Sequence, residues 1–304
     1  MKIVSVDKVY LDPKHIRELK KLGDVVIYND VPDEIEGIKR IKDADIVIDN
    51  WFEMPATVIS AAPKLKLIAV AATGYDWIDI SAAKKHNIVV CNAPGYSTGS
   101  VAEHTIGLLL RAIRLASRAE ADLRAGKWNP TTYKGKELSG KTLGIIGYGA
   151  IGKRVAKIAK NGFGMRILYV NSKNSRQDIE DLLKKSDVVS INAPLTNETR
   201  GMIGTKEFQL MNSGVVIINT GRGAIIDEQS LIDTLKSGKI FAAGLDTYVD
   251  EPMRKDNPLF TFSNVTLTPH IAFNTEESEQ RLSAIVTKNI VAYLANHPQH
   301  VVSA

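Results

Sequence analysis

Short runs of mainly aliphatic and β-branched residues recur along this chain, and they constrain its fold more than any other feature. Three of them precede residue 100, at 24–28, 44–48 and 67–70, and helical patterns separate them. Strands that are apolar on both faces belong to sheets that helices cover on both sides. The first hundred residues therefore predict an α/β domain built on a parallel sheet.

A second series of the same kind follows a helical region. An apolar stripe from Val101 to Ile113 predicts one long linking helix from Ser97 to about Arg124, capped by Ser97 or Ser100. Strands are then predicted at 142–146, 166–170, 187–191, 215–218 and 242–245, and a last helix at about 276–294. A length of 304 residues suits about two domains. The predicted fold class is α/β with two doubly wound parallel-sheet domains.

A glycine-rich turn joins the strand at 142–146 to the helical pattern that follows it. Its sequence is Gly147-Tyr148-Gly149-Ala150-Ile151-Gly152. In dinucleotide-binding domains the first glycine permits the tight turn, the second lets the pyrophosphate approach the backbone, and the third lets helix and strand pack closely. Such turns also occur for packing alone. The strand-turn-helix context favours a cofactor site with Gly147, Gly149, Ala150, Ile151 and Gly152 as contacts.

The end of the next strand bears on the choice between NAD and NADP. In NAD-binding domains an acidic residue about 20 positions after the turn holds the ribose 2′-hydroxyl. Here 171 − 152 = 19, and the residue is Asn171, followed by Ser172 and Lys173. A carboxylate would repel a 2′-phosphate, so neutral donors with nearby cations favour NADP while leaving NAD open. An ordinary polar surface loop is the alternative interpretation.

Composition narrows the functional classes. The single cysteine, Cys91, lies in an apolar run and forms no internal disulfide, which suits a reducing, cytoplasmic setting. The sequence contains no run of about 18 apolar residues, so we predict neither a membrane span nor a signal peptide. The net charge of +5 is spread along the chain without aromatic interleaving, so we expect no nucleic-acid partner. We expect no metal site.

Three later segments lie just past predicted strand ends, where a doubly wound sheet places its ligands. They are Asn219–Gly223, Gly244–Pro252 and Thr268–Ala272. With these segments the sequence resembles the D-isomer-specific 2-hydroxyacid dehydrogenase family over essentially the whole chain. The other supporting motifs are Thr73–Asp79, Asn92–Glu103, the glycine turn and Pro194–Gly201, in the family's order and spacing.

The resemblance implies a Rossmann cofactor domain and a flavodoxin-like substrate domain. It implies that the last helix returns to the first domain, so that the substrate domain comprises 1–98 plus 283–304 and the dinucleotide-binding domain 99–282. It also implies a homodimer built through the region from Ser97 to Gly140. A linker helix buried within one chain would show the same apolar stripe.

The chemistry of a 2-oxo acid reduction explains three of the residues. Hydride adds to the carbonyl carbon and a proton to its oxygen, so the site needs an anion clamp, an acid and a group that tunes the acid. Arg222 offers a planar fork for the carboxylate and carbonyl oxygens. His270 suits the proton donor because imidazole titrates near neutral pH. Glu251 would accept from the other ring nitrogen and favour the imidazolium.

Other roles follow only from the resemblance. It places the substrate carboxylate on the backbone amides of Thr73 and Gly74, and Tyr96 at the substrate or packed at the hinge. It places the nicotinamide carboxamide on Asp246. The remaining predicted cofactor contacts are Ala193, Pro194, Thr199 and Thr220.

The substrate is predicted by exclusion. Phosphoglycerate dehydrogenases of this family carry an arginine where Asp49 and Asn50 stand, which disfavours a phosphorylated substrate. Formate dehydrogenases of this fold pair the histidine with a glutamine, whereas this chain has Glu251. Formate is therefore disfavoured as the substrate. A glyoxylate, hydroxypyruvate or glycerate reductase-like enzyme matches best. D-lactate and branched 2-oxo acids stay open because Trp51, Phe52 and Phe273 could line an apolar pocket. The alternative from a different class is a dinucleotide-sensing, corepressor-like interaction protein.

Overall fold

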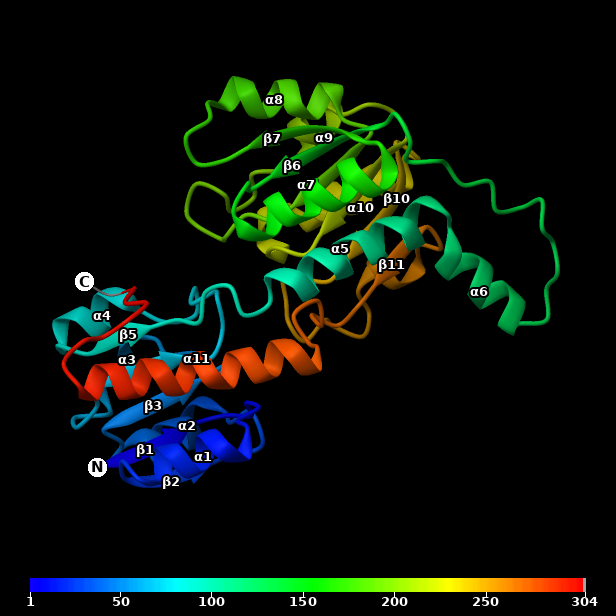
Figure 1. Cartoon of the computed structure of the whole chain (residues 1–304). Coiled ribbons are helices and arrows are strands. Elements are labelled where there is room, and N and C mark those ends of the chain that lie inside the picture. The colour runs from blue at the N-terminus through cyan, green and yellow to red at the C-terminus, as the bar shows by residue number, and fades with distance from the viewer. Residues whose placement is uncertain (303–304) are drawn as a thin grey trace. The chain divides into compact units, whose positions relative to one another are not determined.

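The computed structural model describes residues 1–302, and the chain forms two compact units (Figure 1). One unit comprises Met1–Ser97 and the chain from Asn274 onward, and the other comprises Thr98–Phe273. The boundary predicted at 283 falls inside a helix that runs unbroken from Glu276 to Leu294. Both units are α/β structures on parallel sheets, which confirms the predicted fold class.

The first unit is built on a five-stranded parallel sheet with the order β2-β1-β3-β4-β5. Its strands are β1 (Lys2–Ser5), β2 (Asp24–Ile27), β3 (Ile46–Asp49), β4 (Leu67–Val70) and β5 (Val89–Cys91). Its helices are α1 (Pro13–Lys20), α2 (Glu34–Ile41), α3 (Ala56–Ser60), α4 (Ile80–Lys85) and α11 (Glu276–Leu294). Helices α2, α3 and α4 pack along one face, and α1 packs against α11, which lies over β4 on the other.

The second unit is built on a six-stranded parallel sheet with the order β11-β10-β9-β8-β6-β7. Its strands are β6 (Thr142–Ile146), β7 (Arg166–Val170), β8 (Val188–Ile191), β9 (Val215–Asn219), β10 (Ile240–Leu245) and β11 (Val265–Leu267). Its helices are α5 (Thr98–Ile113), α6 (Ala116–Arg124), α7 (Ala150–Phe163), α8 (Arg176–Lys185), α9 (Thr205–Leu210) and α10 (Glu228–Lys236), with short 3-10 turns η1 (Gly223–Ile225) and η2 (Pro258–Thr261).

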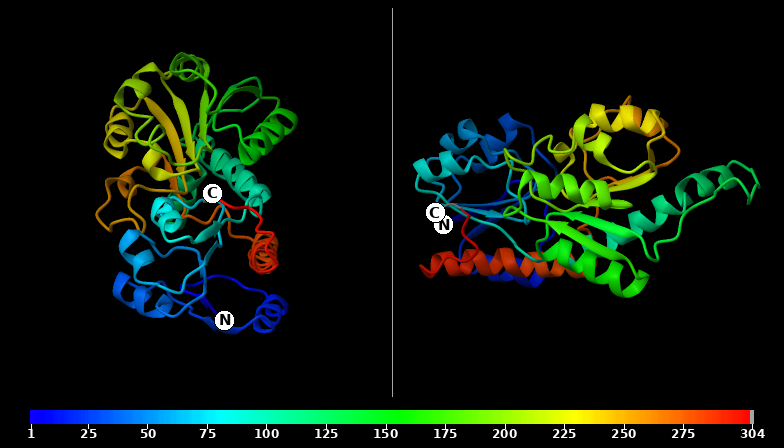
Figure 2. Two further views of the ribbon diagram at one scale, coloured as in Figure 1. Left: turned by 90° about the vertical axis from the view of Figure 1, so that its left-hand side faces the viewer. Right: turned by 90° about the horizontal axis from the view of Figure 1, so that it is seen from above.

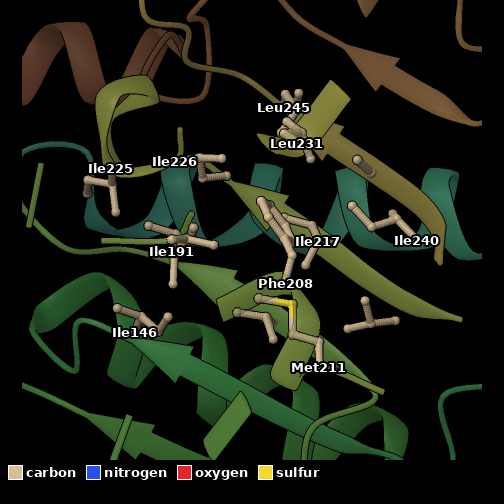
Figure 3. Packing of buried hydrophobic residues seen from close by; sticks show 14 of the residues in the cluster. Ile146, Ile191, Phe208, Met211, Ile217, Ile225, Ile226, Leu231, Ile240 and Leu245 are labelled. Carbon is tan, nitrogen blue, oxygen red and sulfur yellow. The ribbon is translucent and has the colours of Figure 1, made fainter. Parts of the chain in front are cut away.

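Strand β9 shows why its sequence is continuously apolar. Val215 and Ile217 point to the core beneath α8, α9 and α10 (Figure 3). Val216 and Ile218 point to the opposite core, formed with α5 and α7. Figure 2 shows the helices on the two sides of this sheet. Because side chains alternate along a strand, the residues 215–218 are apolar on both faces, and the polar residue of β9, Asn219, stands at its carboxyl end.

The order of the second sheet reverses at β6. Strand β7 pairs with one edge of β6, and β8 and all later strands lie beyond the other edge. In doubly wound sheets ligands bind outside the carboxyl ends of the strands at such a reversal. The glycine turn that follows β6 therefore occupies the position where a dinucleotide is expected.

The prediction of one long helix from Ser97 to Arg124 is wrong. The helix ends at Ile113, and Leu115 takes the left-handed conformation with φ 53° before α6 begins. The Ile113 carbonyl accepts a hydrogen bond from the backbone of Lys136 (3.0 Å) in place of a helical amide. Within the second unit α6 extends away from the sheet (Figure 1), and none of its residues is buried.

Candidate active site

The glycine turn has the geometry of a phosphate-binding loop. Gly147 has φ 95°, and a Cβ there would lie 2.5 Å from the Ala193 nitrogen. A Cβ on Gly152 would lie 2.2 Å from the Gly147 carbonyl oxygen, so helix and turn require a glycine to pack this closely. A Cβ on Gly149 would meet nothing within 4 Å. Gly149 also begins α7 without a side-chain cap, so the first helical amides suit an anion.

The loop after β7 is exposed and strongly hydrogen-bonded to itself. The Asn171 side-chain oxygen accepts from the Lys173 amide (2.9 Å), and the Asn171 amide donates to Asn174 (2.9 Å). Ser172 and Lys173 are exposed. The nearest carboxylate downstream, Asp178, belongs to the capping box of α8, and hydrogen bonds from Ser175 and Asn174 lower its pKa.

The cations of this loop are not equivalent. Arg176 forms an ion pair with Glu207 of α9, whose side chain is buried, whereas none of the ion pairs within residues 1–302 involves Lys173. Tyr148 of the glycine turn stacks on Tyr169 of β7, with ring centroids 3.7 Å apart. The two strand ends are therefore joined by an aromatic pair beside the phosphate turn.

The predicted adenine-side residues follow β8. Ala193 is buried against Gly147, Pro194 is exposed, and the Thr199 hydroxyl donates to the Pro194 carbonyl (2.8 Å). Thr220, which follows β9, is buried and shares its hydroxyl with Thr105 of α5 (2.8 Å). These residues therefore line the carboxyl ends of β8 and β9, next to the glycine turn.

Arg222 lies in a turn that its neighbours hold rigidly. The Asn219 side chain accepts from the Gly221 amide (3.0 Å) and donates to the Arg222 carbonyl (3.0 Å). A Cβ on Gly223 would lie 1.9 Å from the Tyr248 carbonyl carbon, so only glycine fits behind the arginine. The turn presents Arg222 in an extended conformation at the carboxyl end of β9.

Glu251 and His270 form a direct pair. The His270 Nδ1 lies 2.6 Å from the Glu251 Oε2, and the other carboxylate oxygen accepts from the Tyr248 amide (2.8 Å). The side chains keep 22% and 30% of their accessible surface, so the pair is reachable from solvent. Phe273 packs edge-on against the imidazole at 6.1 Å between ring centroids. Because Glu251 engages Nδ1, proton exchange with a ligand would use Nε2.

Asp246 holds the turn that carries His270. It is fully buried, and its carboxylate accepts from Thr268 (2.5 Å) and from the amides of Ile271 and Ala272 (both 2.9 Å). Burial raises the pKa of Asp246, but hydrogen bonds from His104, Thr268 and the two amides outweigh it and lower the pKa overall. Asp246 is among the predicted site residues, but His104 is not. The His104 Nε2 lies 3.0 Å from the Thr268 hydroxyl.

The first unit carries Thr73 and Gly74 on the loop after β4. The Thr73 hydroxyl donates to the Ala93 carbonyl (3.1 Å), and the Thr73 carbonyl accepts from Asn92 (2.8 Å). Within residues 1–302 the backbone amides of Thr73 and Gly74 donate to no protein acceptor. Such amides, held in place by side chains, can bind an anion. Tyr96 is buried, and its carbonyl accepts from Arg281 (2.7 Å).

The aromatic residues that could have lined an apolar pocket differ in position. Phe52 is buried in the core of the first unit, where a Cβ on Gly37 would lie 2.1 Å from its ring. Trp51 keeps 38% of its surface exposed. Phe52 is therefore part of the core and does not line a substrate pocket.

The described residues include neither a candidate metal site nor a candidate membrane-spanning helix. No group of three or more His, Cys, Asp or Glu side chains there could hold a metal ion. No helix there has the length and hydrophobicity to cross a membrane.

Comparison with known proteins gives consistent relatives. Residues 106–272 match the family described as D-isomer specific 2-hydroxyacid dehydrogenase, NAD binding domain. A hydroxypyruvate reductase of Blautia hydrogenotrophica is 39% identical, and the match covers all of both chains. A D-3-phosphoglycerate dehydrogenase of Methanocaldococcus jannaschii is 41% identical over 95% of this chain but only 57% of its own length.

A solved structure extends the comparison to the fold. An acyclic imino acid reductase in complex with NADPH and D-Arg superposes with a TM-score of 0.92 and 36% identity. The superposition covers 99% of this chain and 100% of that one.

Proposed function

Because the chain belongs to the D-isomer-specific 2-hydroxyacid dehydrogenase family, we propose that it reduces a small 2-oxo acid to the D-2-hydroxy acid with NAD(P)H. The observation that carries this proposal is the His270–Glu251 pair, 2.6 Å apart at the carboxyl ends of β10 and β11. An acid oriented by a carboxylate is what carbonyl reduction requires.

His270 supplies the proton. The Glu251 carboxylate accepts from Nδ1 and so orients the ring, and Nε2 donates to the carbonyl oxygen as negative charge develops there. In the oxidative direction the same nitrogen takes the proton back. Phe273 at the ring edge limits how far the imidazole turns.

Arg222 binds the anionic substrate. Its guanidinium pairs with the carboxylate and polarises the carbonyl oxygen, and Asn219 fixes the turn from which it extends. The amides of Thr73 and Gly74 provide an anion-binding element on the first unit.

A bound nicotinamide dinucleotide supplies the hydride. The residues of the second unit fit its phosphates, since Gly149 leaves open space in front of the first amides of α7. Ala150, Ile151, Ala193, Pro194, Thr199 and Thr220 would hold the remainder along the carboxyl edge of the sheet. Asp246 is the proposed contact of the carboxamide, and its Oδ2 accepts one protein hydrogen bond, from the Ala272 amide.

NADP is the proposed cofactor form. Asn171 stands where a carboxylate would reject a 2′-phosphate, and Ser172 and Lys173 are exposed donors beside it. Arg176 contributes less because Glu207 already neutralises it. The discrimination therefore depends on Asn171 and Lys173.

Hydroxypyruvate or glyoxylate is the proposed substrate type. Asn50 offers no positive charge for a phosphate at the carboxyl end of β3, and the structure gives it hydrogen bonds to Asp7 and Lys8 instead. The first unit, Met1–Ser97 with the chain from Asn274 onward, is the proposed substrate domain, and Thr98–Phe273 is the proposed cofactor domain. A single buried thiol supports a cytoplasmic location.

A substrate panel tests the proposal. Oxidation of NADPH and NADH is measured with hydroxypyruvate, glyoxylate, pyruvate and a branched 2-oxo acid, with and without an added primary amine to form imines. We expect amine-independent oxidation, fastest with one of the first two acids. No turnover with any 2-oxo acid, despite cofactor binding measured by fluorescence, would overturn the proposal and favour an interaction protein.

A further inference from the structure

One buried residue brackets the loop that carries Thr73 and Gly74. Asp49, the last residue of β3, is fully buried, and its backbone oxygen accepts from the Ala71 amide (2.6 Å). Its carboxylate accepts from the indole nitrogen of Trp77 (2.6 Å). Both ends of the segment 71–77 are therefore fastened to the same aspartate.

A second buried carboxylate holds the neighbouring turn. Asp7 follows β1, and it accepts from the successive amides of Asn50 (3.1 Å), Trp51 (2.5 Å) and Phe52 (2.9 Å). The Phe52 amide also points at the Asp49 carboxylate (3.2 Å). One N–H group thus lies between the two carboxylates, which places them side by side at the carboxyl ends of the adjacent strands β1 and β3.

The two turns are also joined through their backbones. The Met54 amide donates to the Trp77 carbonyl, and the Asp79 amide donates to the Met54 carbonyl (both 3.0 Å). The segments 50–54 and 71–79 therefore form one unit, and the carboxylates of Asp7 and Asp49 hold it to the carboxyl ends of β1 and β3.

No cation neutralises this pair. None of the ion pairs among the described residues involves Asp7 or Asp49. The guanidinium of Arg40 on α2 donates to the carbonyl of Val6, the residue before Asp7, and pairs with Asp30 and Glu36. The other charged side chains on the packed segments are exposed or partly exposed: Lys8, Glu53, Asp76 and Asp79.

Two buried carboxylates that contact the same N–H group disfavour each other's ionised form, because neither charge is solvated by water. Burial raises the pKa of Asp7 to about 6. Burial, and then the charge of Asp7, raise the pKa of Asp49 well above its ordinary range. The two carboxylates therefore accept the hydrogen bonds of both turns without the free-energy cost of two buried charges.

We infer that Asp49 is a positioning residue for substrate binding: together with Asp7 it clamps the segments 50–54 and 71–79 and so sets the geometry of the Thr73 and Gly74 amides. This inference rests on the proposed function of that loop. The clamp belongs to the first unit, whereas the glycine turn and the His270–Glu251 pair belong to the second. Loosening the clamp should therefore weaken binding of the 2-oxo acid and spare the cofactor.

Trp77→Phe tests the clamp because it removes the indole donor and keeps an aromatic ring. We expect the KM for the 2-oxo acid to rise about 5- to 10-fold, with kcat and the KM for the dinucleotide within about twofold of the wild type. Trp128→Phe is the matched control, since Trp128 is 83% exposed and should change none of these constants.

Asp49→Asn tests the raised pKa values of the two buried carboxylates. Its control is Asp24→Asn, at an exposed position of β2. A group whose folded-state pKa is raised contributes stability below its unfolded pKa and loses it as pH rises through the folded value. Wild-type stability to urea should therefore decline as pH rises above about 4, through about pH 6 for Asp7 and on to higher pH for Asp49. The decline should be smaller in Asp49→Asn and unchanged in Asp24→Asn.

The outcomes separate the possibilities. An unchanged KM for the 2-oxo acid in Trp77→Phe, with only a lower melting temperature, would show that the pair supports the fold alone and would overturn the inference. A fall in kcat without a change in KM would overturn it too. If the wild type reduces no 2-oxo acid, the proposed function fails instead, while the pH dependence of unfolding still reports on the pair. If Asp49→Asn does not fold, Trp77→Phe decides.

Discussion

His270 occupies a backbone conformation that few residues with a β-carbon adopt. Its φ is 51°, and its amide is directed at the carbonyls of Asp246 (2.9 Å) and Thr268 (3.0 Å). Left-handed residues other than glycine persist only where the surroundings determine them, and they cluster at functional sites. The left-handed backbone at His270 therefore directs the imidazole toward Glu251.

His270→Ala should lower kcat on the order of 10²-fold or more while cofactor affinity is retained, because it removes the proton donor. His270→Asn is the companion variant, since asparagine tolerates the left-handed conformation and separates backbone strain from loss of the acid. Steady-state kinetics and fluorescence titration with NADPH measure both effects. Turnover near the wild-type rate in either variant contradicts the assignment.

Asn171→Asp should move the preference from NADPH toward NADH. A carboxylate at this place repels the 2′-phosphate and accepts from the ribose hydroxyl of NADH, so kcat/KM for NADPH should fall by about tenfold or more. Lys173→Ala should weaken the binding of NADPH and leave the binding of NADH unchanged. Equal kcat/KM values for the two cofactors in the wild type, unaltered by Asn171→Asp, would mean that this loop does not discriminate.

At the scale of elements, the turn 268–272 is held by α5 and β10 together. His104 of α5 contacts Thr268, and Asp246 after β10 receives the Thr268 hydroxyl and two amides of the turn. The lowered pKa of Asp246 gives it a stabilising effect above its unfolded pKa of about 3.9, and this effect is lost as pH falls through the folded value. Acid should therefore loosen this turn.

Thr268→Val removes one donor to the buried Asp246 without changing side-chain shape. The loss should cost about 1–3 kcal/mol of unfolding free energy and lower kcat severalfold as the turn loosens. Thr266→Val is the matched control: Thr266 is buried, and its hydroxyl contacts Ser117 of α6 (2.8 Å) instead of Asp246. Urea unfolding should show similar destabilisation in both, with reduced kcat in Thr268→Val alone. Equal kcat values would refute a role for Thr268 in positioning His270.

At the scale of the molecule, the segment that includes α6 has no core of its own. None of its helical residues is buried, and Leu123 and Trp128 are 55% and 83% exposed. Exposed apolar side chains on a projecting element are typical of a protein interface. A second copy of the chain is the partner we propose, giving a homodimer.

Leu123→Glu should therefore shift the protein from dimer to monomer. A charge placed at the centre of an apolar interface is desolvated without a partner. Sedimentation velocity over a range of concentrations measures the shift, and Lys157→Glu on α7, which is exposed outside this segment, is the charge control. A wild type that sediments as a monomer at micromolar concentrations would show that the exposed face has another use.

The sequence predicted the elements well where one physical pattern decided them. The strands at 142–146 and 166–170 have the predicted bounds, because continuous apolar runs between turns leave little choice. The linking helix was predicted too long, because the apolar stripe ends at Ile113 and helix propensity beyond it does not reveal a left-handed Leu115. The final helix has the predicted extent. Its place in the first unit depends on tertiary contacts, such as that of Ser283 with Asp12 (2.8 Å).

For the site, the amino-acid sequence by itself determined which residue types follow the strands, namely a glycine turn after β6 and Arg222, Glu251 and His270 at later strand ends, and these predict the chemistry. Tertiary structure alone decided how those groups are held. Asp49 meets Trp77 and Asp7 meets Phe52, and His104 meets Thr268 across 164 positions, through hydrogen bonds whose formation depends on folding. A buried carboxylate leaves no periodic pattern in a sequence, because its partners are backbone amides and distant side chains that only packing brings within reach.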